Sequence, residues 1–283
     1  MDYDADGLTD ILTGSYTGQF YLFRGQANGS YAQRELLVNE TGATLLMPFD
    51  TVYSVTAELV DMDADGDLDL IVGARSGTVQ VVTNIGTRKA PIWSKDRSPL
   101  KTTAGIEIKG SNAHHADWDG DGFRDLIVGS EHGQVRWYRN TGKNDAPRYA
   151  AASVLVRQAG HSRQEEGSTP TAHGQRVKVH VTDWNGDGLV DLLVGDVTWQ
   201  QSTPNPLNKA EAAKKLKLDR ELSSVRSKLS STAKGAERDQ LQEQVDSIRK
   251  KLRPYNRTKS HTHGWVWLYL RTGKASEASV DRR

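Results

Sequence analysis

Short apolar segments recur along the chain, and each follows a loop that is rich in aspartate. Four of these segments have the length and apolar content of buried strands, and they lie at Leu8–Thr13, Leu68–Ala74, Leu126–Ser130 and Asp191–Trp199. Return segments follow at Gln19–Arg24, Thr78–Asn84, Gln134–Asn140 and Gly264–Arg271, with a hairpin turn at Ser76-Gly77 and an outer strand at Tyr31–Val38. This order predicts antiparallel hairpins that are joined by tight turns.

A further strand is predicted before three of the four loops, at Ser54–Val60, Asn112–Ala116 and Val177–Thr182. The first loop begins at Asp2, directly after Met1, so its unit lacks this strand. Each complete unit has about four short strands, and four-stranded units repeated radially describe a β-propeller. We therefore expect an all-β fold with four blades, the first one incomplete, in a chain that is truncated at its N-terminus.

The four loops share one spacing of acidic residues and glycine. The second loop, Asp61–Asp69, carries carboxylates at positions 1, 3, 5 and 9 and glycine at position 6. A glycine there permits a sharp turn that a side chain would obstruct. The position-6 glycines are Gly7, Gly66, Gly122 and Gly188, which are 59, 56 and 66 residues apart. Repetition at such a period indicates a repeat architecture.

The spacing predicts a calcium site in each loop. Ca²⁺ takes about six to eight oxygen ligands, whereas Mg²⁺ prefers few protein ligands and several waters. An EF-hand would need a glutamate at position 12, where this chain has Thr13, Val72, Val128 or Val194. The aspartate at position 9 must therefore close the cage, together with a backbone carbonyl at position 7. The predicted ligands are Asp2, Asp4, Asp6, Leu8 and Asp10; Asp61, Asp63, Asp65, Asp67 and Asp69; Asp117, Asp119, Asp121, Phe123 and Asp125; and Asp183, Asn185, Asp187, Leu189 and Asp191. Asn185 replaces a carboxylate, which predicts a weaker fourth site.

The loop motif Asp-x-Asp-x-Asp-Gly-x-x-Asp, followed by Leu-Ile-Val-Gly, resembles the FG-GAP/VCBS repeats. These repeats form the calcium-loop blades of integrin-alpha-like propellers and of many secreted bacterial proteins. The resemblance covers residues 1–200 and 264–272, and it implies a seven-bladed ring of which four blades are present. The Phe-Gly and Gly-Ala-Pro signatures of the animal subset are absent, with Val72-Gly73-Ala74-Arg75 as the nearest approach. The resemblance is therefore to the bacterial type.

An insertion of different composition separates the last strand from its return segment. Two apolar stripes step by three and four residues, as in a helical hairpin or coiled coil; they are Leu218, Leu222, Val225 and Leu229, then Leu241, Val245, Ile248 and Leu252. Gly235 lies between them. We expect a propeller part at 1–200, an insertion at 201–263 with an antiparallel helical hairpin at about 208–252, and a return strand with a C-terminal tail at 264–283.

Three polar residues occupy one shared position, three residues before the first aspartate of a loop. They are Glu58, His114 and His180. Equivalent positions in consecutive blades lie at equal radius, so these side chains are predicted to face a central channel. Imidazole and carboxylate are common metal ligands, but a solvated polar channel lining is the favoured interpretation because no matching fourth ligand is visible.

Aromatic and histidine residues near the loops have competing interpretations. Trp118 and Trp184 stand at position 2 of their loops. They could stack on sugars, but packing between blades is favoured because Tyr3 and Met62 at the same position are also bulky. His173, His261 and His263 are favoured as surface histidines over a further metal site.

Composition narrows the function only a little. The formal net charge is +1, the chain has no cysteine, and no apolar run reaches the length of a membrane span. Disulfides and thiolate chemistry are therefore excluded. Residues 207–253 carry 13 Lys and Arg against 7 Asp and Glu, but acids are interspersed and no aromatics interleave, so we expect no nucleic-acid partner.

The sequence predicts a calcium-binding propeller that acts as a binding, adhesion or scaffolding module outside the cytoplasm, at the cell surface or in the periplasm. A signal peptide is absent, which the predicted truncation explains. The expected partner is an unknown protein or polysaccharide ligand at the cell surface, and the helical hairpin is a second candidate partner site. No catalytic constellation is visible, so we expect no enzyme. The alternative is the propeller domain of a carbohydrate-active lyase or hydrolase, with a channel-mouth site at Glu58, His114 and His180.

Overall fold

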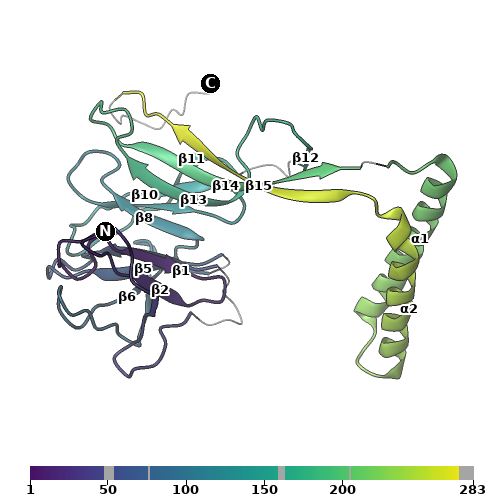
Figure 1. Ribbon diagram of the computed structural model, residues 1–283, viewed down its shortest axis with the longest axis horizontal. Coiled ribbons are helices and arrows are strands. Elements are labelled where there is room, and N and C mark those ends of the chain that lie inside the picture. The colour runs from purple at the N-terminus through teal and green to yellow at the C-terminus, as the bar shows by residue number, and fades with distance from the viewer. Residues whose placement is uncertain (48–53, 76, 159–162, 204, 274–283) are drawn as a thin grey trace. The chain divides into compact units, whose positions relative to one another are not determined.

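The computed structural model describes residues 1–47, 54–75, 77–158, 163–203 and 205–273 (Figure 1). Within them the fold is mostly β, with four mainly antiparallel sheets and two α-helices. The predicted turn residue Ser76 and residues 274–283 of the predicted C-terminal part, 264–283, lie outside the described residues. The structure divides into two compact units. Unit 1 consists of Met1–Ser162, Pro170–Thr198 and His263–Arg283, and unit 2 of Arg163–Thr169 and Trp199–Thr262.

Each aspartate-rich loop leads into the strand that organises its sheet. Sheet 1 has the order β1 (Ile11–Gly14), β2 (Phe20–Phe23) and β3 (Glu35–Leu36). Sheet 2 has the order β4 (Thr56–Val60), β5 (Asp69–Gly73), β6 (Gln80–Val82) and β7 (Ser98–Pro99). Sheet 3 repeats this order with β8 (Asn112–Ala116), β9 (Asp125–Gly129), β10 (Val135–Tyr138) and β11 (Ser153–Val156). The strands after the loops are where the apolar runs predicted them.

Sheet 4 departs from this pattern. β13 (Gln175–Thr182) pairs with β14 (Asp191–Ser202), and β14 pairs with β15 (Lys259–Tyr269). A short parallel strand, β12 (Arg163–Glu165), also pairs with β14. β14 and β15 are longer than their counterparts in sheets 2 and 3, and both contribute residues to unit 2.

The apolar core of unit 1 lies between consecutive sheets. Successive residues of a strand point to opposite faces of its sheet. Leu70 and Val72 of β5 pack with residues of sheet 1, whereas Ile71 between them packs with residues of sheet 3. The same alternation occurs one sheet later, at Leu126, Ile127 and Val128. We call the side of a sheet toward the preceding sheet its back face, and the side toward the following sheet its forward face.

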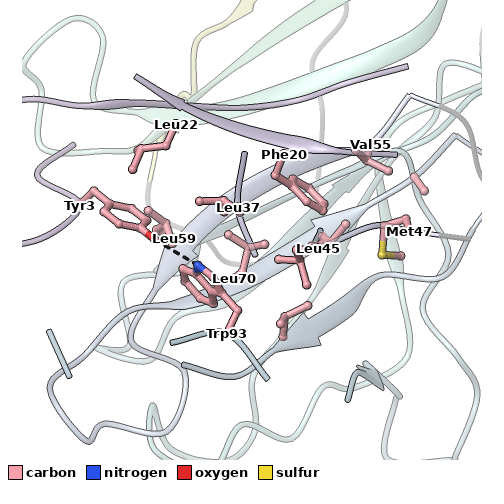
Figure 2. Packing of buried hydrophobic residues seen from close by; sticks show 13 residues of the cluster. Tyr3, Phe20, Leu22, Leu37, Leu45, Met47, Val55, Leu59, Leu70 and Trp93 are labelled. Carbon is pink, nitrogen blue, oxygen red and sulfur yellow. Dashed lines mark hydrogen bonds between the residues drawn. The ribbon is translucent and has the colours of Figure 1, made fainter. Parts of the chain in front are cut away.

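An aromatic pair connects the first loop to sheet 2. Figure 2 shows Tyr3 and Trp93 within the cluster between sheets 1 and 2. The Trp93 indole N–H donates to the Tyr3 hydroxyl at 3.0 Å, and the two side chains are almost fully buried. Burial raises the pKa of Tyr3 above its usual value of 10.0, so the hydroxyl stays neutral. This pairing satisfies both polar groups inside the apolar cluster.

Polar contacts also join the sheets where their first strands lie side by side. The carbonyl oxygen of Ser111 accepts a hydrogen bond from the Thr56 hydroxyl at 3.0 Å and one from the Lys178 ammonium at 2.8 Å. These donors come from sheets 2 and 4. Burial lowers the pKa of Lys178 to about 8. One backbone position before β8 therefore bridges three sheets.

Unit 2 contains the predicted helical hairpin. α1 (Lys209–Ser231) begins at Asn208, whose side chain accepts from the Glu211 N–H while Glu211 accepts from the Asn208 N–H. This capping box satisfies two otherwise unpaired backbone donors. α2 (Ala236–Leu252) follows the turn at Gly235, and a short 3₁₀ helix, η1 (Arg253–Tyr255), ends it. Along the predicted stripes, Val245, Ile248 and Leu252 are buried and the other apolar residues are half-buried. Among the described residues, neither helix is long and apolar enough to cross a bilayer.

Truncation of a side chain between the sheets should be costly. Leu126 is fully buried between sheets 2 and 3. We expect Leu126→Ala to lower the free energy of unfolding by about 3 kcal/mol, from lost burial and the cavity left behind. Ile106→Ala, at a residue that is 66% exposed, should change it by less than about 0.5 kcal/mol. Urea titrations of both variants measure this, and equal effects would contradict the proposed location of the core.

Candidate metal centre

All four loops lie at the same place in their sheets. Loops 2, 3 and 4 connect β4 to β5, β8 to β9 and β13 to β14. The residue before each loop pairs with the aspartate that ends it, as Val60 does with Asp69. In loop 1, Met1 takes this position, and its backbone exchanges hydrogen bonds with that of Asp10 at 2.6 and 3.1 Å. The four loops are therefore comparable position by position.

The aspartate at position 1 shapes the turn of each loop. In loop 3, Asp117 Oδ1 accepts from the N–H groups of Gly120 and Asp121, and Oδ2 accepts from that of Gly122. The corresponding bond from the position-6 glycine to the position-1 carboxylate recurs in every loop. Position 6 has φ between 84° and 91° in all four loops, which is a backbone conformation that glycine adopts at no steric cost.

Carboxylates converge in three of the loops. In each of three groups, the ligand atoms of the three residues all lie within 4.8 Å of one another. The groups are Asp2, Asp4 and Asp6; Asp61, Asp63 and Asp65; and Asp117, Asp119 and Asp125. Positions 1 and 3 occur in every group, and position 5 or 9 completes it. Among the described residues, loop 4 contains no converging group of acidic residues. Position 3 of this loop is Asn185, and its side-chain amide donates to an Asp187 carboxylate oxygen at 2.9 Å.

Each converging group contains a buried carboxylate oxygen that has no hydrogen-bond partner within the part of the chain that the structure describes. These atoms are Asp4 Oδ1, Asp61 Oδ1 and Asp119 Oδ1. A buried oxygen without a partner loses its hydration and is costly. A hard cation removes that cost, because it binds anionic oxygen directly. The residues present therefore fit a calcium-sized ion in loops 1, 2 and 3.

The aspartate at position 9 has a role that the sequence reasoning missed. Asp69 is 2% exposed, its Oδ2 accepts from the Met62 N–H at 3.1 Å, and its Oδ1 accepts from the Asn84 N–H at 2.8 Å. The carboxylate thus connects the start of the loop to the end of the return strand. The same two bonds recur at Asp10, Asp125 and Asp191, all of which are buried. We call this arrangement the carboxylate staple.

The staple corresponds to a constant spacing in the sequence, which predicts it. In the first three units, the aspartate and the residue that donates from the return strand are 15 positions apart, at Asp10–Gly25, Asp69–Asn84 and Asp125–Asn140. In the fourth unit the insertion obscures the spacing, and the donor is the Arg271 N–H.

Burial dominates the electrostatics of the staple. It raises the pKa of Asp69 and of Asp125 from 3.8 to about 6, although the backbone hydrogen bonds lower each of them. Burial also raises the pKa of Asp67, which nearby Asp65 and Asp63 raise further. The loops therefore hold more negative charge than the fold readily accommodates, and a bound cation would favour the ionised forms.

Arginines from the return strands reach two of the loops. Arg24 forms an ion pair with Asp4 in loop 1, and Arg139 lies 2.5 Å from Asp119 and 3.0 Å from Asp121 in loop 3. The two arginines occupy one position, directly before the residue that donates to the staple. Each binds the outer oxygen of the position-3 aspartate and leaves Oδ1 free. Sequence reasoning did not assign them a role.

The structure brings the three predicted channel residues together. His114 Nδ1 lies 3.1 Å from Glu58 Oε1, and the rings of His114 and His180 are 4.7 Å apart. Burial lowers the pKa of His180, and neighbouring His114 lowers it further. This trio is not among the groups whose ligand atoms converge within 4.8 Å in the described residues. The geometry therefore favours a polar row over a metal site.

The remaining aromatic and histidine candidates lie in different places in the fold. Trp118 is partly buried against the cluster between sheets 3 and 4, as the packing interpretation predicted, whereas Trp184 is 60% exposed. The ring of His173 contacts the Gly133 carbonyl at 2.9 Å, in unit 1. His261 pairs with Glu166 at 3.6 Å, in unit 2.

Comparison with known proteins agrees with the repeated loops. The sequence model of a protein family described as FG-GAP-like repeat matches residues 2–72 and 117–194, more than half of the chain. A search of curated proteins finds no match. The two matched segments contain all four loops.

The staple and the cation cage should respond differently to mutation when calcium is removed. We expect Asp69→Ala to destabilise the EGTA-treated protein by about 3 kcal/mol, because the Met62 and Asn84 N–H groups lose their acceptor. Asp63→Ala, at an exposed residue of the same cage, should leave that stability unchanged or slightly higher, because it relieves repulsion between carboxylates. Urea unfolding in EGTA measures both effects. Equal losses for the two variants would mean that the staple has no role separate from the cage.

Proposed function

The chain belongs to the FG-GAP-like repeat family, and from this premise we propose that it is a calcium-binding β-propeller module that acts in binding or adhesion outside the cytoplasm. The four sheets are its blades, and each of the four loops binds one Ca²⁺. FG-GAP repeats are compatible with a binding or adhesion module. The observation that carries the calcium proposal is the buried, unpartnered carboxylate oxygen in each of three converging groups.

The ion has a structural role in this proposal. Each loop lies between the first two strands of its sheet, and the position-1 carboxylate and glycine already give it a compact turn. Ca²⁺ neutralises the clustered carboxylates and fixes the entry of the following strand. Because the cage exists only in the folded chain, the ion stabilises that fold by mass action. Millimolar calcium outside the cell would keep the sites filled.

The binding surfaces of the proposal are the faces of the propeller and the helical hairpin. A protein or polysaccharide at the cell surface is the proposed partner. The helical hairpin, α1 and α2, has an excess of basic residues, which favours an acidic partner there. We propose the hairpin as a second binding element, because the described parts of sheets 1, 2 and 3 contain no such helical insertion.

Calcium should raise the thermal stability of the protein. We expect the melting temperature to rise by at least about 5 °C when about 1 mM Ca²⁺ is added to the metal-stripped chain, because several sites bind only the folded state. EGTA should reverse the change, and Mg²⁺ at the same concentration should have a smaller effect. Differential scanning calorimetry measures it. A melting temperature that does not change when calcium is added would contradict the proposal that the ion is structural.

The size of the calcium effect should also depend on pH. Burial raises the pKa of Asp69 and Asp125 from 3.8 to about 6 in the ion-free fold. Between these pH values the folded chain keeps protons that the unfolded chain has lost, so these two groups lower the ion-free stability as the pH rises. Calcium needs the ionised carboxylates and must displace those protons. The calcium-induced rise should therefore be smaller at about pH 5 than at about pH 7.5.

A second candidate function rests on the polar row of Glu58, His114 and His180. A carboxylate that orients one of two adjacent imidazoles can serve proton transfer. As the alternative, we propose a carbohydrate-active enzyme, a lyase or hydrolase, whose site lies along this row. The contact between Glu58 and His114 and the proximity of the two rings support this alternative.

This alternative predicts turnover that depends on the row. His114→Ala and His180→Ala should each lower cleavage of a polysaccharide by at least about 100-fold. His132→Ala, at an exposed histidine outside the row, serves as the matched control and should retain activity. Release of reducing or unsaturated ends from neutral and anionic polysaccharides measures it. Absence of turnover in the parent protein, or unchanged turnover in both variants, would reject the enzyme alternative.

A further inference from the structure

The position directly before the staple donor differs between the four units. The staple gives this position the same place in every sheet, since the next backbone N–H donates to the position-9 aspartate. In sheets 1 to 4 the residue is Arg24, Thr83, Arg139 and Leu270. Two of the loops therefore have an arginine beside them in their own sheet, and the other two have an uncharged residue.

Where the arginine is present, it covers the aspartate at position 3 of the loop. The Arg139 Nε lies 2.5 Å from Asp119 Oδ2, and Arg24 forms an ion pair with the equivalent oxygen of Asp4. The side chains of Asp4 and Asp119 are 17% and 10% exposed. Asp63, at the same position of loop 2, is an exposed residue. The arginine thus shields a carboxylate that otherwise faces solvent.

The guanidinium of Arg139 joins two carboxylates of loop 3. Besides Asp119, it contacts Asp121 with an N–O distance of 3.0 Å. A guanidinium is always charged and presents several N–H donors in a fixed plane, so it suits two carboxylates at once. It reduces the repulsion between the position-3 and position-5 carboxylates without an ion from solution. The same positive charge opposes a divalent cation that approaches these oxygens.

Loop 2 combines the largest negative charge with the lack of an arginine. Loops 1 and 3 carry four carboxylates each and loop 4 carries three, whereas loop 2 carries five. These are Asp61, Asp63, Asp65, Asp67 and Asp69. Among the described residues, no lysine or arginine forms an ion pair with any of them. The additional carboxylate, Asp67, is 7% exposed, and its Oδ1 has no hydrogen-bond partner in the described part of the chain. Loop 2 therefore has the greatest need for a cation from solution.

We propose that Arg24 and Arg139 are built-in substitutes for a cation, which hold loops 1 and 3 together when calcium is scarce and lower the calcium affinity of these loops below that of loop 2. The affinity part rests on the proposed calcium function, whereas the stabilisation of the loops by arginine does not. As calcium falls, loops 1 and 3 lose their ions first but keep their turns. Loop 2 releases its ion later and then opens, so the response of these three loops to calcium is concentrated in loop 2.

Hydrogen exchange in EGTA, followed by mass spectrometry of peptides from loops 2 and 3, tests the role of the arginine without calcium. After correction for intrinsic rates, we expect loop 3 to exchange at least about threefold more slowly than loop 2. Arg139→Thr gives loop 3 the residue of sheet 2 and should remove this difference, and the reciprocal Thr83→Arg should slow exchange in loop 2.

Arg136→Thr is the matched control, because Arg136 lies in the same strand and its side chain donates to Gln134. This variant should leave both loops as they are in the parent chain. Equal exchange of the two loops in the parent, or unchanged exchange of loop 3 in Arg139→Thr, would overturn the role of the arginine as a substitute cation.

A calcium titration of the same exchange tests the order of affinity. Calcium should protect loop 3 further, because Asp119 Oδ1 has no hydrogen-bond partner among the described residues even beside the arginine. We expect the midpoint for loop 2 at a calcium concentration at least about tenfold lower than for loop 3. Arg139→Thr should lower the loop 3 midpoint, and Thr83→Arg should raise that of loop 2. Equal midpoints in the parent, or midpoints that neither variant moves, would overturn the affinity part. A chain in which no loop gains protection would reject the proposed calcium function and this order with it, whereas the result in EGTA judges the arginine separately.

Discussion

The buried carboxylate at position 9 is the contact on which each sheet of unit 1 depends. In sheet 3, Asp125 is fully buried and accepts from the N–H groups of Trp118 and Asn140. These donors belong to the start of the loop and the end of the return strand, so one side chain fixes three segments of backbone. Burial disfavours the charged form of a carboxylate, and it raises the pKa of Asp125 to about 6. The two hydrogen bonds offset it only while both donors stay in place.

Because the staple fixes where each return strand ends, it also fixes which side chains point forward. A shift of one residue would move every apolar side chain of a strand to the opposite face. In β10, Val135 and Trp137 point to sheet 4, and Tyr138 points to sheet 2. The same count places Val266 and Leu268 of β15 on the forward face of sheet 4. A polar contact at the edge of each sheet thus determines the composition of the apolar interfaces.

Much of this architecture was predictable because the sequence repeats it. The apolar runs after the loops, the sharp turn at position 6 and the proximity of Glu58, His114 and His180 follow from equivalence between units. The predicted outer strand Tyr31–Val38 is reduced to Glu35–Leu36 in β3, and β12 was not expected. Such pairings depend on tertiary contacts more than on local pattern. The ion pairs of Arg24 and Arg139 were missed because only two of the four units have arginine at this position, where the others have Thr83 and Leu270.

The aspartates of a loop have two roles, which are to bind backbone N–H groups and to form the cation cage. The position-9 carboxylate binds backbone donors that come from the chain itself, so its contacts form without an ion. The carboxylates at positions 1 and 3 converge with the one at position 5 in loops 1 and 2, and with the staple aspartate Asp125 in loop 3. One buried oxygen in each converging group has no hydrogen-bond partner among the described residues. Repulsion within that group opposes folding, whereas the staple and the interfaces between sheets favour it. A cation bound there therefore removes a penalty from a sheet that is already organised, in contrast to small zinc modules, whose fold requires the metal.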